Sequence, residues 1–298
     1  MKSITLITGI LLIIVIGCNQ SKEPASDVEV ITTKGYELHR VKNSNKTLVL
    51  FPGGGTTAKE IKADFNILPI ATEHNISVLM VNFNRHLWID KIQTERLSNE
   101  LDTLFLRHNL NYDHVFIGGM SIGGNVALTL SNYLIQTNNL IAPEGVFIVD
   151  SPIDLFALYE SATKDLLNSD FDEQRLAEPR FIINYFTEEF GKDSLVENIQ
   201  RVSPFTLKTG KNSVPDLSKV KLRFYTEPDS LWWQKNRQTD FENTNAYVIQ
   251  QIAKNLKKEK WTKFELIETE NKGYRSNGDR HPHSWSIVDI EELLNWVK

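Results

Sequence analysis

A serine set between glycines constrains this chain more than any other feature of its sequence. The segment GGMSIGG at residues 118–124 follows an apolar run, and residues 125–134 have the apolar spacing of a helix. A turn sharp enough to join that strand to that helix strains the backbone of Ser121 and leaves no room for side chains at Gly119 and Gly123. The sequence therefore predicts a strand, a tight turn and a helix in direct succession, with the Ser121 hydroxyl projecting from the turn.

This G-x-S-x-G pattern, between a predicted strand and a predicted helix, resembles the nucleophile elbow of the α/β-hydrolase superfamily. The resemblance extends from about Val28 to the C-terminus. It implies the α/β-hydrolase fold, which is a mostly parallel sheet flanked by helices on both faces, and it implies that Ser121 is a nucleophile.

The order of the predicted elements is a separate argument for an α/β fold. Strands are predicted at residues 28–31, 36–41, 47–51, 77–82, 145–150, 222–225 and 264–269, and helices at 59–74, 94–109, 243–258 and from Ser286 onward. Strands that alternate with helices favour a parallel sheet. Residues 151–220 interrupt the alternation with helical patterns, which predicts a cap insertion over the active site.

Composition favours a single globular domain over residues 28–298. Of the 298 residues, 41% are hydrophobic and 24% are charged, which is ordinary for a globular protein. The net charge of −5 provides no basic footprint, so we expect no nucleic-acid partner. The sequence also has no spacing typical of metal ligands, so we expect a mechanism without metal or cofactor.

The first residues are typical of a targeting segment. Lys2 is followed by an apolar run over residues 4–17, which fits a signal peptide and is too short to span a bilayer. The run ends in VIGC, which resembles the bacterial lipobox and implies lipidation of Cys18, the only cysteine. We therefore expect a signal peptide at 1–17, a tether at 18–27 and a domain lipid-anchored to a membrane of the bacterial cell envelope. The alternative is an uncleaved membrane anchor with an incidental cysteine.

A serine nucleophile needs a base, and in the fold that this chain resembles the histidine lies nearest the C-terminus. The loop before the last predicted helix supplies His281 and His283. His283 lies nearer to the helix and is the predicted base, whereas His281, the alternative base, is expected to shape the loop with Pro282. The pattern Ser286-x-x-Asp289 predicts a capping box at the start of that helix.

Three carboxylates are candidates for the acid that orients the histidine. Asp229 lies a few residues past a predicted strand, where the resemblance implies the acid, and is favoured. Glu227 is the close alternative, because a carboxylate of either length can orient an imidazole. Asp150, at the end of the strand after the elbow, is the third.

Backbone N–H groups are the predicted oxyanion-hole donors. One belongs to Ile122, which follows the nucleophile, and the others belong to Gly53 and Gly54. The segment FPGGGTT at residues 51–57 resembles the H-G-G-G loop of the superfamily but lacks its leading histidine.

Further residues near the site are interpreted mainly as structural. Arg85 and His86 follow the carboxyl end of a predicted strand, the side on which ligands bind in open α/β sheets, but solvent exposure is the expected state. Five aromatic residues of the insertion are expected to form the core of the cap: Phe156, Tyr159, Phe181, Tyr185 and Phe186.

Together these features predict a serine hydrolase that acts through an acyl-enzyme on an ester, thioester or amide, most nearly a carboxylesterase. The expected partners are a small-molecule or peptidyl acyl substrate and, through lipidated Cys18, a membrane. The alternative is a noncatalytic binding or scaffold lipoprotein that retains the fold.

Replacing Cys18 with alanine should prevent lipid attachment and release the domain from membranes, because the rest of the sequence offers no other obvious membrane-spanning segment. Detergent partitioning and the intact mass of the mature protein measure this. A mature chain that keeps residues 1–17 and carries no diacylglycerol would contradict the lipobox interpretation.

Overall fold

The computed structural model describes residues 27–298. The predicted signal peptide, Cys18 and nearly all of the predicted tether lie outside the described residues. Among the helices of residues 27–298, none combines the length and the apolar character needed to cross a bilayer.

Eight strands within residues 27–298 form one sheet, in the order β1-β2-β4-β3-β5-β6-β7-β8. They are β1 (Val28–Thr32), β2 (Tyr36–Val41), β3 (Lys46–Phe51), β4 (Ile76–Val81), β5 (Val115–Met120), β6 (Pro143–Val149), β7 (Lys221–Thr226) and β8 (Phe264–Glu268). Strand β2 runs antiparallel to both of its neighbours, and all other neighbouring pairs are parallel. The predicted mostly parallel sheet is confirmed.

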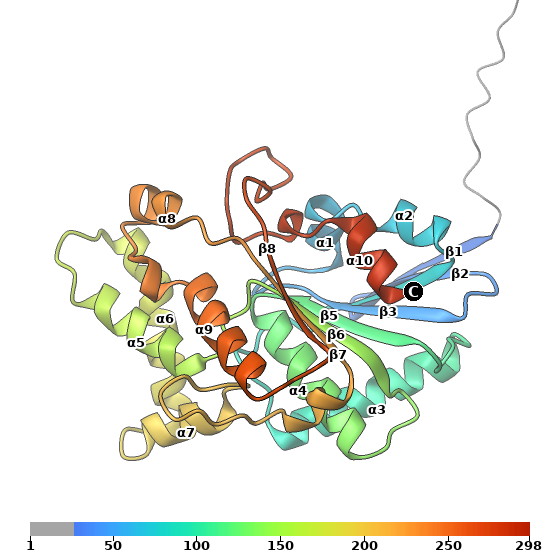
Figure 1. Cartoon of the computed structure of the whole chain (residues 1–298), viewed down its shortest axis with the longest axis horizontal. Helices are drawn as coiled ribbons and strands as arrows, with labels where there is room; N and C mark the ends of the chain where they lie inside the picture. The colour runs from blue at the N-terminus through green and yellow to red at the C-terminus, as the bar shows by residue number, and fades with distance from the viewer. Residues whose placement is uncertain (1–26) are drawn as a thin grey trace, which may run out of the picture.

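Helices cover both faces of the sheet (Figure 1). They are α1 (Ala58–Asp64), α2 (Leu68–Glu73), α3 (Lys91–Arg107), α4 (Ile122–Gln136), α5 (Leu155–Leu166), α6 (Glu173–Phe190), α7 (Leu195–Val202), α8 (Ser230–Arg237), α9 (Asn245–Lys258) and α10 (Ile290–Val297), with short 3₁₀ turns η1 (Pro215–Lys219), η2 (Phe241–Asn243) and η3 (Trp285–Ile287). Helices α1, α2 and α10 pack on one face, and α3, α4 and α9 pack on the other.

The two faces have separate cores because side chains alternate along a strand. In β3, Val49 and Phe51 join the core beneath α3 and α4, whereas Leu48 and Leu50 join the core beneath α1 and α10. All four side chains are fully buried, which explains why this strand is a continuous apolar run in the sequence.

The predicted helix at 59–74 is in fact two helices, α1 and α2. Between them Phe65 turns inward and stacks on Trp285, with ring centroids 5.0 Å apart. Pro69 then lies in the first turn of α2. Backbone N–H groups there have no intrahelical acceptor, so the absence of an N–H in proline costs no hydrogen bond. Burial of Phe65 and the proline together explain the break.

The predicted capping box at Ser286 is wrong. Helix α10 is capped by Asp289, whose carboxylate accepts the N–H of Glu292. The Ser286 hydroxyl instead accepts the N–H of Tyr274 at 2.7 Å and donates to the carbonyl oxygens of Lys272 and Tyr274. Ser286 therefore ties the histidine loop to the chain after β8, because tertiary partners outcompete the local cap.

Helices α5, α6 and α7 lie between β6 and β7, where the sequence predicts a cap. Phe186 is fully buried, and its ring stacks on Trp88 with centroids 5.2 Å apart. This contact joins α6 to the loop that precedes α3. In Figure 1, α5 and α6 extend beyond the edge of the sheet.

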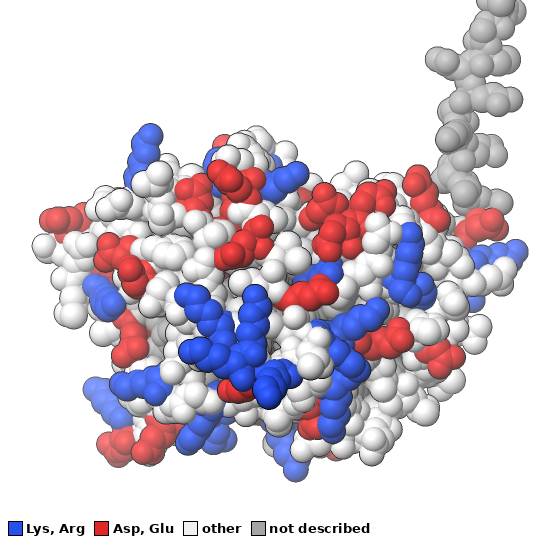
Figure 2. Space-filling model, in the orientation of Figure 1, with Lys and Arg blue, Asp and Glu red and all other residues white. Residues whose placement is uncertain are grey.

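Both signs of charge are interspersed over the face drawn in Figure 2. Lysine and arginine side chains gather at its centre, in the region where Figure 1 shows α9. The last turn of α9 contains Lys257 and Lys258, and positive charge there is favourable to the helix dipole.

Candidate active site

Ser121 occupies a strained turn between β5 and α4. Its backbone has φ 54° and ψ −130°, a region that residues other than glycine rarely adopt. The turn is held from both sides, since Ser121 N–H donates to the carbonyl of Val149 and Gly124 N–H donates to the carbonyl of Ser121, each at 3.0 Å. The serine side chain makes no capping bond to α4 and lines a cavity instead.

The glycines around Ser121 leave no space for a side chain, as the sequence predicts. A Cβ atom at Gly119 would lie 2.2 Å from the carbonyl oxygen of Gly123. One at Gly123 would lie 2.3 Å from the carbonyl oxygen of Pro52. The elbow therefore packs backbone against backbone, which only glycine permits.

His283 is oriented by Asp150. The Nδ1 atom of His283 lies 2.7 Å from Oδ2 of Asp150, whose side chain is 4% exposed. Thr226, the last residue of β7, donates its hydroxyl to the other carboxylate oxygen at 2.7 Å. Asn245 donates to the carbonyl oxygen of Asp150 at 2.9 Å. Thr226 thus fixes one carboxylate oxygen and Asn245 fixes the backbone of Asp150, so that the second carboxylate oxygen is directed at the imidazole.

The favoured pairing of His283 with Asp229, and the alternative pairing with Glu227, are not found in the structure. Asp229 caps α8 by accepting the N–H of Trp232, and it pairs with Arg280 at 2.7 Å. Glu227 also pairs with Arg280.

Burial and backbone contacts keep Glu227 in that pairing. Its side chain is 1% exposed and accepts the N–H groups of Lys272 and Gly273. Strands β6 and β7 are neighbours, so loops after both strands reach the same edge of the sheet. Chain order alone could not show which of these acids contacts His283. The position of Arg280 shows it, because Arg280 pairs with Glu227 and Asp229.

His281 lies beside the candidate base and has a different environment. Its Nδ1 accepts the N–H of His283 at 3.2 Å, and its ring packs against Trp232 and Trp233. Burial, aided by the positive charge of Arg275, lowers the pKa of His281 to about 3. The imidazole is therefore neutral at ordinary pH and acts as a hydrogen-bond acceptor that shapes the loop.

Ser121 and His283 line one cavity of about 990 Å³. Its cap side consists of residues from α5 and α6: Leu158, Ser161, Ala162, Asp165, Arg175, Glu178, Pro179, Phe181, Ile182 and Tyr185. The aromatic residues of the cap therefore divide into two groups. Phe156 and Phe186 are core, as expected, and Tyr159 packs against that core. The expectation is wrong for Phe181, which is 54% exposed and, with Tyr185, faces the cavity.

Backbone donors for an oxyanion lie around Ser121. The N–H of Ile122 is in the first turn of α4, where an N–H has no intrahelical acceptor. Gly53 and Gly54 line the same cavity, and a Cβ at Gly53 would lie 3.6 Å from the Cβ of Ser121. The N–H of Gly55 is occupied, because it donates to the carbonyl of Asn84 at 3.0 Å.

Two contributors to the site have no signal in the sequence. Thr226 and Asn245 both hold Asp150, but they lie 76 and 95 residues from it in the chain. Only the pairing of β6 with β7 and the packing of α9 bring them to the acid. Within residues 27–298, no group of three or more His, Cys, Asp or Glu side chains could hold a metal ion.

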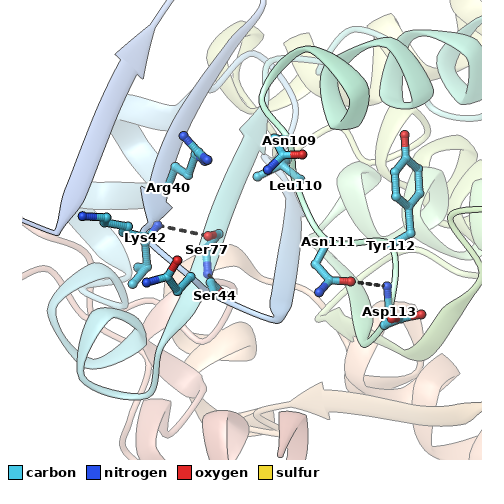
Figure 3. A pocket seen from close by; sticks show the side chains of 11 residues that line it. Arg40, Lys42, Ser44, Ser77, Asn109, Leu110, Asn111, Tyr112 and Asp113 are labelled. Carbon is cyan, nitrogen blue, oxygen red and sulfur yellow. Dashed lines mark hydrogen bonds between the residues drawn. The ribbon is translucent and has the colours of Figure 1, made fainter.

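A second hollow, of about 590 Å³, lies near the amino ends of β3, β4 and β5 (Figure 3). Its two serine hydroxyls are both engaged with backbone. Ser77 accepts the N–H of Val41, and Ser44 donates to the carbonyl oxygens of Lys46 and Asn75. No histidine lines this hollow, so it lacks the constellation found around Ser121.

The sequence matches no model of a known protein family and no curated protein. Solved structures are nevertheless similar to it. An esterase of the fungus Rhizomucor miehei aligns with 91% of this chain and 82% of its own, with a TM-score of 0.58 and 14% identity. Carboxyl esterase 2 of the mycorrhizal fungus Tuber melanosporum aligns over 94% and 87%, with a TM-score of 0.56 and 13% identity. The Francisella virulence factor BioJ aligns over 92% and 86%, with a TM-score of 0.53 and 14% identity.

The sheet order, the helices on both faces and these similarities agree. The chain has the α/β-hydrolase fold, with Ser121 at the turn after β5.

Replacing Gly119 with alanine should lower the free energy of unfolding by about 1–3 kcal/mol, because the new methyl group would overlap the Gly123 backbone. Gly35→Ala is the matched control, since a Cβ there meets no atom within 4 Å. Denaturant unfolding of both variants measures the difference. Equal midpoints for the two variants would show that the elbow tolerates a side chain.

Proposed function

We propose that this protein is a serine hydrolase that cleaves an ester through an acyl-enzyme, with Ser121 as nucleophile, His283 as base and Asp150 as the orienting acid. The observation that carries the proposal is the combination of a strained Ser121 with a His283–Asp150 pair at the same cavity. Strained backbone of this kind persists only where the surrounding structure imposes it, and it clusters at active sites because the strain is part of the mechanism there.

The proposed mechanism follows from which nitrogen of His283 is already hydrogen-bonded. Nδ1 of His283 is held by Asp150, which leaves Nε2 to take the proton from Ser121 as its oxygen attacks the ester carbonyl. Asp150 stabilises the imidazolium that forms. The N–H of Ile122, together with one from Gly53 or Gly54, stabilises the oxyanion. His283 then gives the proton to the leaving alcohol. In the second half, His283 takes a proton from water as the water oxygen attacks the acyl carbonyl, and it gives that proton to the Ser121 oxygen as the acyl–serine bond breaks.

Two observations support a small ester as substrate. The cavity volume is in the range of small-molecule sites, and apolar side chains of α5 and α6 line its cap side. The fungal proteins of similar fold are named esterases. In our proposal the cap sets the size of the acyl or alcohol group, and lipidation of Cys18 holds the enzyme at a membrane.

Replacing Ser121 with alanine should abolish labelling by a fluorophosphonate probe and hydrolysis of para-nitrophenyl esters, because the reactive hydroxyl is lost. Activity should fall by several orders of magnitude, roughly 10⁴-fold or more. Circular dichroism and thermal unfolding serve as the folding control. A pure, folded Ser121→Ala preparation that keeps its turnover would end the serine mechanism, and wild-type protein that neither reacts with the probe nor hydrolyses esters would favour a noncatalytic binding protein.

Asp150→Asn tests which carboxylate serves the base. We expect kcat to fall by roughly three to four orders of magnitude, because an amide cannot stabilise the imidazolium or fix its tautomer. Asp229→Asn is the control, and we expect it to keep most of the rate, since asparagine still caps α8 and only the ion pair with Arg280 is lost. Steady-state kinetics on one activated ester compare the two variants. A larger loss in Asp229→Asn than in Asp150→Asn would return the role of acid to Asp229.

A further inference from the structure

The cavity around Ser121 has arginines in its lining, and they are not equivalent. Arg175 is neutralised by Asp165, with Nη2 and Oδ2 2.8 Å apart, and it also donates to Thr239. Arg85, Arg237 and Arg275 also line the cavity, but their side chains are exposed and form no ion pair with any residue of 27–298. Three guanidinium groups at this cavity therefore have unused donors.

Three of the four acidic residues of the lining have other partners, and the fourth, Glu178, forms no ion pair within residues 27–298. Glu60 belongs to the capping box of α1, and Asp64 accepts the N–H of Ser276 at 2.8 Å. Asp165 pairs with Arg175, and Glu178 lies on α6 near that pair. None of them forms an ion pair with Arg237 or Arg275.

Two of these arginines, Arg237 and Arg275, flank the histidine loop, whereas Arg85 lies between β4 and α3. Arg237 ends α8, and Arg275 lies in the loop between β8 and η3. Their charges act on His281, the neighbour of the proposed base, where both help to keep the imidazole neutral. Two carboxylates that follow β7 are engaged elsewhere, because Arg280 pairs with both Glu227 and Asp229.

We propose that Arg237 and Arg275 bind an anionic group on the substrate, so that the preferred ester has a carboxylate or phosphate away from its scissile bond. The inference rests on the proposed function and specifies its substrate class. A guanidinium presents a planar fork of donors that matches carboxylate and phosphate oxygens. Cations at the rim of a cleft with apolar walls also raise the local concentration of an anionic substrate.

Arg237 could affect activity by stabilising α8 as well as by binding substrate, so the experiment must distinguish the two effects. Positive charge in the last turn of a helix is favourable to the helix dipole, and Arg237 is in the last turn of α8. Lys235 lies in the same turn but does not line the cavity. Lys235→Gln therefore removes the same charge from the helix end and leaves the cavity unchanged, which makes it the matched control.

The experiment compares kcat/KM for esters that differ only in charge. Para-nitrophenyl hexanoate and mono-para-nitrophenyl adipate differ in a carboxylate on the acyl side, and phenyl acetate and 4-acetoxybenzoate differ in one on the alcohol side. Wild type, Arg237→Gln, Arg275→Gln, the double variant and Lys235→Gln are assayed, with Ser121→Ala as the blank for spontaneous hydrolysis.

We expect wild type to favour the anionic ester of at least one pair. Each glutamine variant should lower kcat/KM for that ester by about two- to fivefold, and the double variant by about tenfold or more, with the neutral ester little changed. Lys235→Gln should keep the wild-type preference, and added salt should reduce it.

No preference for either anionic ester in wild type would overturn the inference, and so would equal losses on charged and neutral esters in the glutamine variants. Neither result touches the proposed function, provided that the neutral esters are hydrolysed in a Ser121-dependent way. Absence of hydrolysis on all four esters would instead defeat the proposed function, and this inference with it.

Discussion

The strained backbone at Ser121 is the constraint on which the rest of the site depends. A positive φ at a residue with a side chain costs about 1–3 kcal/mol and persists only where the surroundings impose it. Here the hydrogen bond to Val149 and the backbone packing of Gly119 against Gly123 impose it. The parallel pairing of β5 with β6 supplies the first of these contacts. The sheet thus stabilises the conformation that directs the serine side chain to the cavity.

Carboxylates at the same edge of the sheet each have a specific partner. Asp150 holds His283, whereas Glu227 and Asp229 hold Arg280. A buried charge without a partner is costly, so these pairings exclude one another. Arg280 therefore forms ion pairs with the two acids that chain order favours, and Asp150 is the acid that contacts His283.

The cap is attached to the fold by aromatic contacts. Trp88, which precedes α3, stacks on Phe186 and Phe190 and meets the edge of Tyr185. These contacts position α6 over the elbow, so that one side of the helix is core and the other lines the cavity. Aromatic residues of one helix thus serve packing and the site together.

Local patterns in the sequence determined the elements and the elbow. Alternating or continuous apolar runs predicted the strands, and glycine spacing predicted the turn at Ser121, because both depend on the backbone of neighbouring residues. His283 was also found from its place in the chain, and its role as base stays a prediction. The inward turn of Phe65, which divides one predicted helix, was not visible in the local pattern.

Only the tertiary structure decided which acid meets the histidine. Asp150 and His283 are 133 residues apart, and their contact depends on the order of β6 and β7 in the sheet and on the side chains that occupy competing acids. The same holds for the free arginines at the cavity, since ion pairing between distant residues has no local signal. Sequence spacing sets backbone conformation over a few residues, whereas the partner of a buried charge is chosen by the packing of the whole sheet.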